Sequence, residues 1–175
     1  MQLNLRSLQD AHEHFEKQYE PSLFPDVRDP FRVVSPVALS FDVDRQETGR
    51  YRVAGRLSGE IELACSRCLE AFRMPVAADF DLRYVPHAEN TGHGENDEKE
   101  VEEDDLSTAF YENDAIDLGQ LIMEQFQLAQ PMKPLCREEC KGLCPNCGMN
   151  LNTGTCDCNV KWEDPRLAAL KTIKF

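Results

Sequence analysis

Apolar and polar residues alternate with a period of two along most of the first half of the chain, which is the pattern of antiparallel strands with one buried face. The apolar positions of the three runs are Phe31, Val33, Val37, Leu39, Phe41 and Val43, then Tyr51, Val53, Leu57, Ile61, Leu63 and Cys65, then Phe72, Met74, Val76, Ala78, Phe80, Leu82 and Tyr84. We interpret Gly55 and Gly59 as bulges, or as a break that divides the second run. Met1, Leu3 and Leu5 indicate another strand, and residues 7–20 show a weak helical pattern.

The apolar period becomes helical in the second half of the chain. Asp117 is a good helix N-cap, and Gln120 stands at the capping-box position behind it. The helical stripe that follows consists of Leu118, Leu121, Ile122, Phe126 and Ala129, and it ends before Pro131 and Pro134. A short final helix is predicted from Asp164 and Pro165, an N-cap followed by proline at the first helical position.

Charge separates the two halves. The eleven residues from 95 to 105 hold eight acids and one lysine, a charge of −7 within a total of −13. So polar a segment cannot bury enough surface to offset its ordering entropy, and we interpret it as a solvated linker. Mimicry of RNA by its charge, or repulsion of wrong partners, is the alternative.

Together these patterns predict an α+β protein: an antiparallel sheet or partly closed barrel, then a helix and a cysteine-rich zinc-binding module. The expected boundaries are 1–87 for the β domain, 88–107 for the acidic linker, and 108–175 for the helix with the cysteine-rich module. A chain of 175 residues with 41% hydrophobic residues suits such a fold.

Cellular location follows from what the sequence does not contain. It shows no apolar run of the roughly 18 residues that a membrane span needs, and polar residues follow Met1 where a signal peptide would be apolar. We therefore expect a cytoplasmic protein, in which disulfides rarely persist. Its eight cysteines are then best explained as metal ligands.

The cysteines suggest two sites. Cys144 and Cys147 are separated by Pro145 and Asn146 and followed by Gly148, a spacing that grips one ion from a tight turn with the backbone amides facing sulfur. The preferred pairing joins these two to Cys156 and Cys158. The remaining four would form a second site that clamps the sheet to the C-terminal module: Cys65, Cys68, Cys136 and Cys140. Interleaved pairings, with Cys140 serving the C-terminal site, stay open.

Zinc in such sites is expected to be structural, as one or two ions, because four thiolates leave no open position for water or substrate. Oxidation of the thiolates with release of the ion is the alternative, a redox switch. Motifs of phosphate-binding loops, zinc proteases and serine hydrolases are absent from the sequence, so no catalytic residue is assigned and the protein is expected not to be an enzyme.

Arginine dominates the cationic residues of the predicted sheet. Nine arginines and no lysine lie between residues 28 and 83, and arginine matches phosphates and stacks on unpaired bases. The candidates for RNA contact are Arg50, Arg52, Arg56, Arg67 and Arg73. Cross-strand ion pairs with Glu60 and Glu62 are the competing explanation. The overall negative charge excludes an indiscriminate polyanion binder.

Three motifs together resemble the YceD family of bacterial and plastid large ribosomal RNA subunit accumulation proteins. They are Cys65-Ser66-Arg67-Cys68-Leu69-Glu70-Ala71-Phe72, the run from Cys140 to Asn152, and Asp164-Pro165-Arg166-Leu167-Ala168-Ala169-Leu170. The resemblance implies a non-enzymatic role in accumulation of the large-subunit (23S) rRNA, and hence in ribosome assembly. Some relatives look as if they lack the full C-terminal cysteine cluster, so that cluster is expected to stabilise the protein rather than to be essential to its activity.

The sequence thus predicts a ribosome assembly factor that binds precursor large-subunit rRNA or an early ribosomal protein, with no membrane and no small-molecule substrate. The alternatives are a zinc-stabilised protein–protein adaptor, which would recruit its partner through residues 118–126 and the acidic segment, and a thiol redox switch. The RNA segment or protein bound and the oligomeric state do not follow from the sequence.

Overall fold

A computed structural model of the chain describes residues 1–25, 31–46, 49–87 and 107–158. These form two compact units: the first comprises residues 1–63 and 72–132, and the second residues 64–71 together with those from 133 onward. Residues 108–132 thus lie in the same unit as the strands, and residues 64–71 in the same unit as the cysteine-rich segment. Most of the acidic segment and the expected helix at Asp164 lie outside the described residues.

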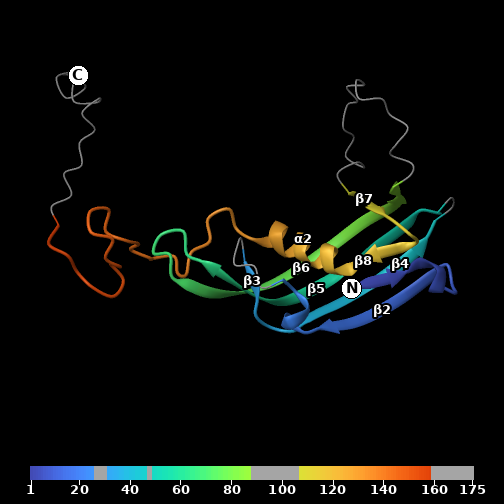
Figure 1. The fold of residues 1–175 in the computed structure, drawn as a ribbon, viewed down its shortest axis with the longest axis horizontal. Coiled ribbons are helices and arrows are strands. Elements are labelled where there is room, and N and C mark those ends of the chain that lie inside the picture. Colours follow the sequence, from blue (N-terminus) through green and yellow to red (C-terminus); the bar gives the residue numbers. More distant parts are fainter. Residues whose placement is uncertain (26–30, 47–48, 88–106, 159–175) are drawn as a thin grey trace, which may run out of the picture. The chain divides into compact units, whose positions relative to one another are not determined.

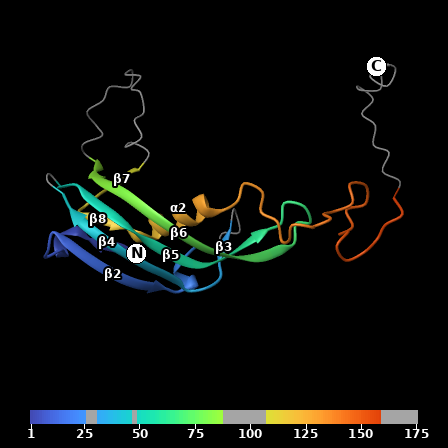
Figure 2. The ribbon, with the colours of Figure 1, turned by 180° about the vertical axis from the view of Figure 1, so that it is seen from behind.

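The first unit is mostly sheet with one helix (Figures 1 and 2). Its elements are β1 Gln2–Asn4, β2 His12–Tyr19, β3 Arg32–Val33, β4 Val37–Arg45, β5 Tyr51–Ala64, β6 Ala71–Pro86, β7 Thr108–Tyr111, β8 Ala115–Asp117 and α2 Leu118–Ala129, with single 3-10 turns at Leu5–Ser7 and Pro21–Leu23. No helix among the described residues is long and apolar enough to cross a membrane.

The larger sheet has the strand order β2-β4-β5-β6-β7, and β3 also pairs with β5. Strands β4 and β5 are antiparallel, as expected, and β2 is also antiparallel to β4, but β6 and β7 run parallel. Within the described residues β2 and β7 end the order without pairing to each other, so the sheet does not close into a barrel. A second, two-stranded sheet joins β1 to β8 across more than a hundred residues.

The three alternating runs became strands with the expected buried faces. Gly55 does not break β5: a Cβ there would lie 2.3 Å from the Ser40 carbonyl oxygen and 2.6 Å from Phe41, so glycine lets β4 approach closely. Phe126 of α2 packs edge-on against Phe31, with ring centroids 6.1 Å apart. The helix therefore closes the core on one face of the sheet.

The helical prediction for residues 7–20 is wrong, because much of that segment forms β2. Half-buried and exposed side chains alternate along it, and Phe15 stacks on Phe41 of β4 at 5.3 Å between ring centroids. The segment is an edge strand whose inner face includes Glu13 and Lys17, so hydrophobicity does not show its period of two. The helix at Leu118 is confirmed, with Asp117 accepting hydrogen bonds from the N–H groups of Gly119 and Gln120 at 2.8 and 3.3 Å.

Candidate metal centres

Two groups of four thiols lie in the second unit. One consists of Cys65, Cys68, Cys136 and Cys140 and the other of Cys144, Cys147, Cys156 and Cys158, and the sulfur atoms of each group lie within 4.8 Å of one another. We call them cluster 1 and cluster 2. The structure thus groups the eight cysteines as the preferred pairing did, and the interleaved arrangement is not formed.

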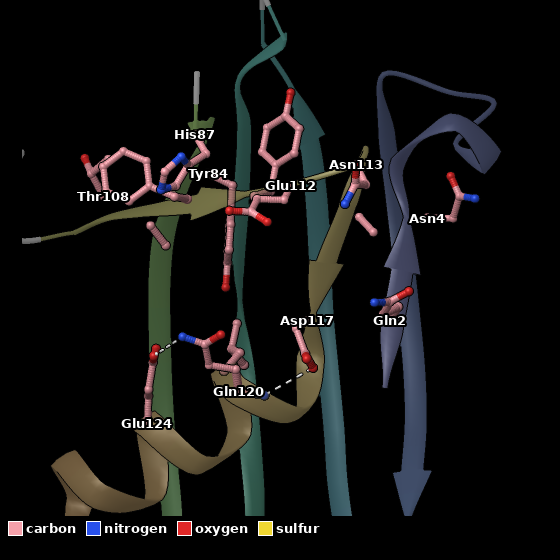
Figure 3. A pocket seen from close by; sticks show the side chains of 15 residues that line it. Gln2, Asn4, Tyr84, His87, Thr108, Glu112, Asn113, Asp117, Gln120 and Glu124 are labelled. Carbon is pink, nitrogen blue, oxygen red and sulfur yellow. Dashed lines mark hydrogen bonds between the residues drawn. The ribbon is translucent and has the colours of Figure 1, made fainter. Parts of the chain in front are cut away.

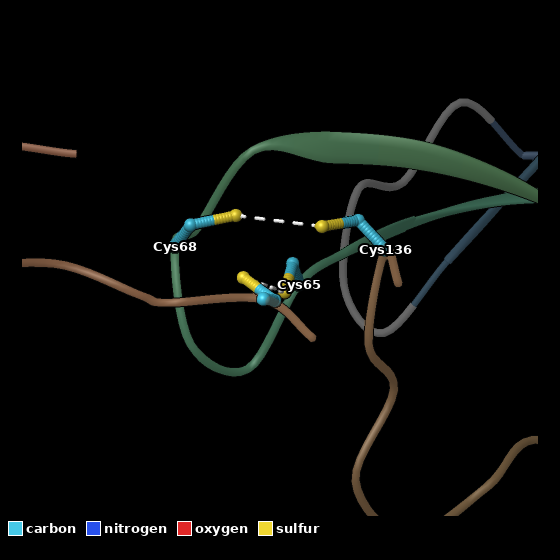
Figure 4. A group of neighbouring side chains, drawn as sticks. Cys65, Cys68 and Cys136 are labelled. Carbon is cyan, nitrogen blue, oxygen red and sulfur yellow. Dashed lines mark hydrogen bonds between the residues drawn. The ribbon is translucent and has the colours of Figure 1, made fainter. Parts of the chain in front are cut away.

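Cluster 1 brings together cysteines from separate segments, among them Cys65, Cys68 and Cys136 (Figure 4), at the spacing of a metal site and not of a disulfide. The Sγ atoms of Cys65 and Cys140 are 3.8 Å apart, as are those of Cys68 and Cys136. A tetrahedron with zinc–sulfur bonds of about 2.3 Å has edges of about 3.8 Å, whereas a disulfide needs about 2.05 Å. Four thiols at this spacing fit one tetrahedral ion.

Each cluster begins with the same backbone turn. In the first turn the N–H of Leu69 donates to the Cys65 carbonyl at 2.9 Å, and the N–H of Cys65 donates to the Glu70 carbonyl at 2.9 Å. In the second, Gly148 donates to the Cys144 carbonyl at 2.9 Å, and Cys144 donates to that of Met149 at 2.8 Å. We call these two C-x-x-C turns, residues 65–70 and 144–149, knuckle 1 and knuckle 2.

Backbone amides point at the first sulfur of each knuckle, as predicted for the second one; at Cys65 one of them belongs to Cys136, outside the turn. Amide hydrogen bonds, from Cys136 and then Cys68, lower the pKa of the Cys65 thiol from 9.0 to about 6. Those from Cys147 and Asn146 lower the pKa of Cys144 to about 6 as well. Both first cysteines therefore favour the thiolate, the form that binds metal, near neutral pH.

Four of the other thiols shift in the opposite direction, with a raised pKa: Cys68, Cys136, Cys156 and Cys158. Burial, followed by the neighbouring sulfurs, raises the pKa of Cys136 to about 12. In cluster 2 the Cys147 sulfur, followed by burial, raises the pKa of Cys158 to about 12. Negative charge on one sulfur disfavours it on the next, so four neighbouring thiolates require a cation between them.

Asn152, to which the sequence assigned no role, orients cluster 1. Its Nδ2 donates to the Cys140 sulfur at 3.3 Å, and its Oδ1 accepts from the Lys141 N–H at 2.9 Å and from the Arg137 guanidinium at 2.8 Å. Burial opposes ionisation of Cys140, but the bonds from Asn152 and the Gly142 amide lower its pKa overall. Asn152 is the last residue of the motif from Cys140 to Asn152, but nothing in the neighbouring sequence distinguishes it from Asn146.

Arg67, a candidate for RNA contact, lies between the cysteines of knuckle 1. One of its guanidinium nitrogens donates to the backbone carbonyls of Glu138 and Cys140, at 3.1 and 2.9 Å. The N–H of Leu143 donates in turn to the Arg67 carbonyl at 3.1 Å. The residue therefore ties knuckle 1 to the segment that carries the other half of cluster 1.

The remaining candidate arginines lie in the first unit, where Arg52 and Arg56 form ion pairs. Arg52 makes two hydrogen bonds to Asp81, at 2.8 and 2.5 Å, and Arg56 makes two to Asp79, at 2.6 and 3.0 Å. The predicted alternative of ion pairs is thus formed, but with aspartates of β6, while Glu62 pairs with Arg32 at 2.8 Å. Arg50 and Arg73 are exposed.

Histidines continue the charged face on the other side of β4. His12 Nδ1 lies 2.6 Å from an Asp44 oxygen and His14 Nδ1 lies 2.7 Å from one of Asp42. The hydrogen bond to Asp44 raises the pKa of His12 above 6.5. This face of the sheet therefore alternates cationic and anionic strands, and much of its arginine charge is neutralised in place.

Comparison with known proteins gives one family. The family profile described as "Large ribosomal RNA subunit accumulation protein YceD" matches residues 53–174. A chloroplastic protein of Zea mays, named large ribosomal RNA subunit accumulation protein YCED homolog 1, is 31% identical over 78% of this chain and 54% of its own. The Arabidopsis thaliana protein of the same name is 28% identical over 80% of this chain and 49% of its own.

The chain thus spans about half the length of these plant relatives. A Mycobacterium tuberculosis protein, named only as uncharacterized, is 32% identical over 57% of this chain. No solved structure matched the chain significantly.

Proposed function

Because the chain belongs to the YceD family of large ribosomal RNA subunit accumulation proteins, we propose that it is a non-catalytic assembly factor that promotes accumulation of the large-subunit (23S) rRNA. The observation that carries the proposal is the family match over residues 53–174, which includes all eight cysteines of the two clusters. The part of the chain that defines the family is thus also the part that carries the candidate metal centres.

The proposed role of the metal is structural. Each cluster offers four thiols at tetrahedral spacing, which suits one Zn²⁺ in a closed shell and leaves no position for substrate. When bound, the ion would cross-link the β5–β6 connection to the C-terminal segment at cluster 1 and hold the loops of residues 144–158 at cluster 2. Binding free energy would thereby become folding free energy for a module with few buried apolar side chains.

Charge on the described surface supports a protein partner over direct phosphate contact by the arginines of β5. A phosphate would have to displace Asp81 from Arg52 and Asp79 from Arg56, each held by two hydrogen bonds. The chain also carries a net charge of −13. We therefore propose that it acts on rRNA chiefly through an early, basic ribosomal protein, and that it does so in the cytoplasm, where its thiols stay reduced.

Depletion of the protein tests the proposed function. Cells that lose it should show a lower ratio of large- to small-subunit rRNA, and expression of the wild-type chain should restore the ratio. An unchanged ratio would overturn the proposal. Capture of the native protein, with sequencing of the bound RNA and identification of the bound proteins, then separates the two kinds of partner. RNA that stays bound to the protein after all ribosomal proteins have been removed would contradict the proposal that it acts through a ribosomal protein.

A further inference from the structure

A cavity of about 840 Å³ opens beside the N-terminal end of α2, a volume within the roughly 300–1,000 Å³ typical of ligand sites. All of its walls belong to the first unit: the small sheet β1–β8, the ends of β6 and β7, and the first two turns of the helix (Figure 3). None of its lining residues belongs to the metal clusters, and none is one of the ion-paired residues of the charged face.

The lining is anionic and aromatic. It contains three carboxylates, Glu112, Asp117 and Glu124, and none of its fifteen residues is a lysine or an arginine. Asp117 is already engaged, since its Oδ1 caps α2 and lies 3.7 Å from the N-terminal amine. Glu124 Oε1 accepts a hydrogen bond from Gln120 Nε2 at 2.8 Å, a neutral partner that leaves the carboxylate charge in place. The charge that faces the cavity therefore comes mainly from Glu112 and Glu124.

Tyr84 is an independent sign of a ligand. Its side chain rises from β6 beneath the cavity and only 5% of the residue is exposed, yet its hydroxyl makes no hydrogen bond to any of the described residues. Figure 3 shows this hydroxyl directed toward the space between Gln120, Glu124 and Asp117. Burial, followed by the charges of Glu124 and Asp117, raises the pKa of Tyr84, so the hydroxyl stays neutral. The hydroxyl thus opens onto the cavity, where it can donate to or accept from a bound group.

The composition of the walls selects the ligand. Carboxylates exclude a phosphate or another anion, and carboxylates beside aromatic rings suit a cationic nitrogen, which can donate to oxygen and lie over a ring face. We propose that the cavity binds an ammonium or guanidinium group, presented by a lysine or arginine side chain of the basic protein on which this chain acts. The identity of that protein rests on the proposed function, whereas the chemistry of the cavity does not.

The test is titration of the full-length protein with a capped basic peptide of alternating lysine, arginine and glycine, with NMR detection of the Tyr84 and Glu124 signals. Glu124→Gln and Tyr84→Phe should each weaken binding about tenfold, because each removes a charged or buried hydrogen-bond partner. The matched controls are Glu16→Gln, an exposed carboxylate on β2, and Tyr19→Phe, a half-buried tyrosine on the same strand. Both should bind as the wild type does.

Spermidine and a capped glutamate-rich peptide complete the design. Binding of the basic peptide but not of spermidine would support a protein side chain as the ligand. Binding of spermidine alone would contradict the proposal that the cation belongs to a protein. Equal binding by all variants, or binding of the acidic peptide, overturns the site. The depletion experiment reports on rRNA independently, so failure of the cavity leaves the proposed function standing.

Discussion

Leu69 and Gly148 occupy the same position in two copies of one turn. Each follows the second cysteine of its knuckle, and each donates its N–H to the carbonyl of the first cysteine at 2.9 Å. Each also has a positive φ, 61° for Leu69 and 73° for Gly148. The backbone conformation that glycine adopts without cost in knuckle 2 is thus imposed on a leucine in knuckle 1.

Leu69→Asn should stabilise the protein. A left-handed conformation costs an ordinary L-residue roughly 1–2 kcal/mol, and asparagine tolerates it better. Because 67% of Leu69 is exposed, little packing is lost. The free energy of unfolding in urea should therefore rise by about 0.5–1 kcal/mol. Leu128→Asn, which changes an exposed leucine in the ordinary helical conformation of α2, should lower it slightly.

Gly148→Ala should instead destabilise the protein. A Cβ at residue 148 would meet no atom within 4 Å, so the cost is that of the positive φ alone, about 1 kcal/mol. Loss of stability in Leu69→Asn equal to that in Leu128→Asn would contradict the assignment of strain to knuckle 1.

Metal content should follow the two clusters. The protein purified under reducing conditions should contain about two zinc ions per chain by elemental analysis, one for each set of four thiols. Cys68→Ser and Cys147→Ser should each lower the content to about one, and the double variant to about zero. Ser66→Ala, inside knuckle 1 but without a sulfur, should leave it unchanged. Retention of both ions in either single variant would show that the clusters are not the ligands.

Asn152→Ala should weaken metal binding at cluster 1 alone. The side chain donates to the Cys140 sulfur and fixes the Lys141 backbone, and loss of such partners typically costs about 10–100-fold in metal affinity. Chelator competition in a Cys147→Ser background, in which only cluster 1 is complete, measures the effect. Asn146→Ala, an exposed asparagine of knuckle 2, is the matched control; an equal loss from it would point to a general loss of stability instead.

His12 should titrate above its ordinary value. Its hydrogen bond to Asp44 raises the folded-state pKa above 6.5. The pair therefore contributes its full stabilisation below pH 6.5, and that contribution is lost as the pH rises through the folded-state pKa. NMR titration of the ring protons should show this midpoint, and Asp44→Asn should return it toward 6.5. Asp79→Asn, on β6, should leave it where it was.

Local pattern was enough for most elements of the first unit. Strands β4, β5 and β6 and the helix α2 can be predicted from the sequence because each buries one face, so that apolar residues recur at the period of the element. Strand β2 cannot be predicted in this way, since it is an edge strand whose inner face carries Glu13, Phe15 and Lys17 and so is not uniformly apolar. Its secondary structure was decided by pairing with β4, which no local period records.

The site divides in the same way. The C-x-x-C spacing and the glycine of knuckle 2 are local, because two thiols on one tight turn need only a few residues to converge on an ion. Which pairs share a cluster, that Asn152 holds Cys140, and that Arg52 meets Asp81 depend on segments far apart in the sequence. The cavity is the extreme case: the pairing of Leu3 with Ile116 builds one of its walls, and chain topology alone brings such residues together.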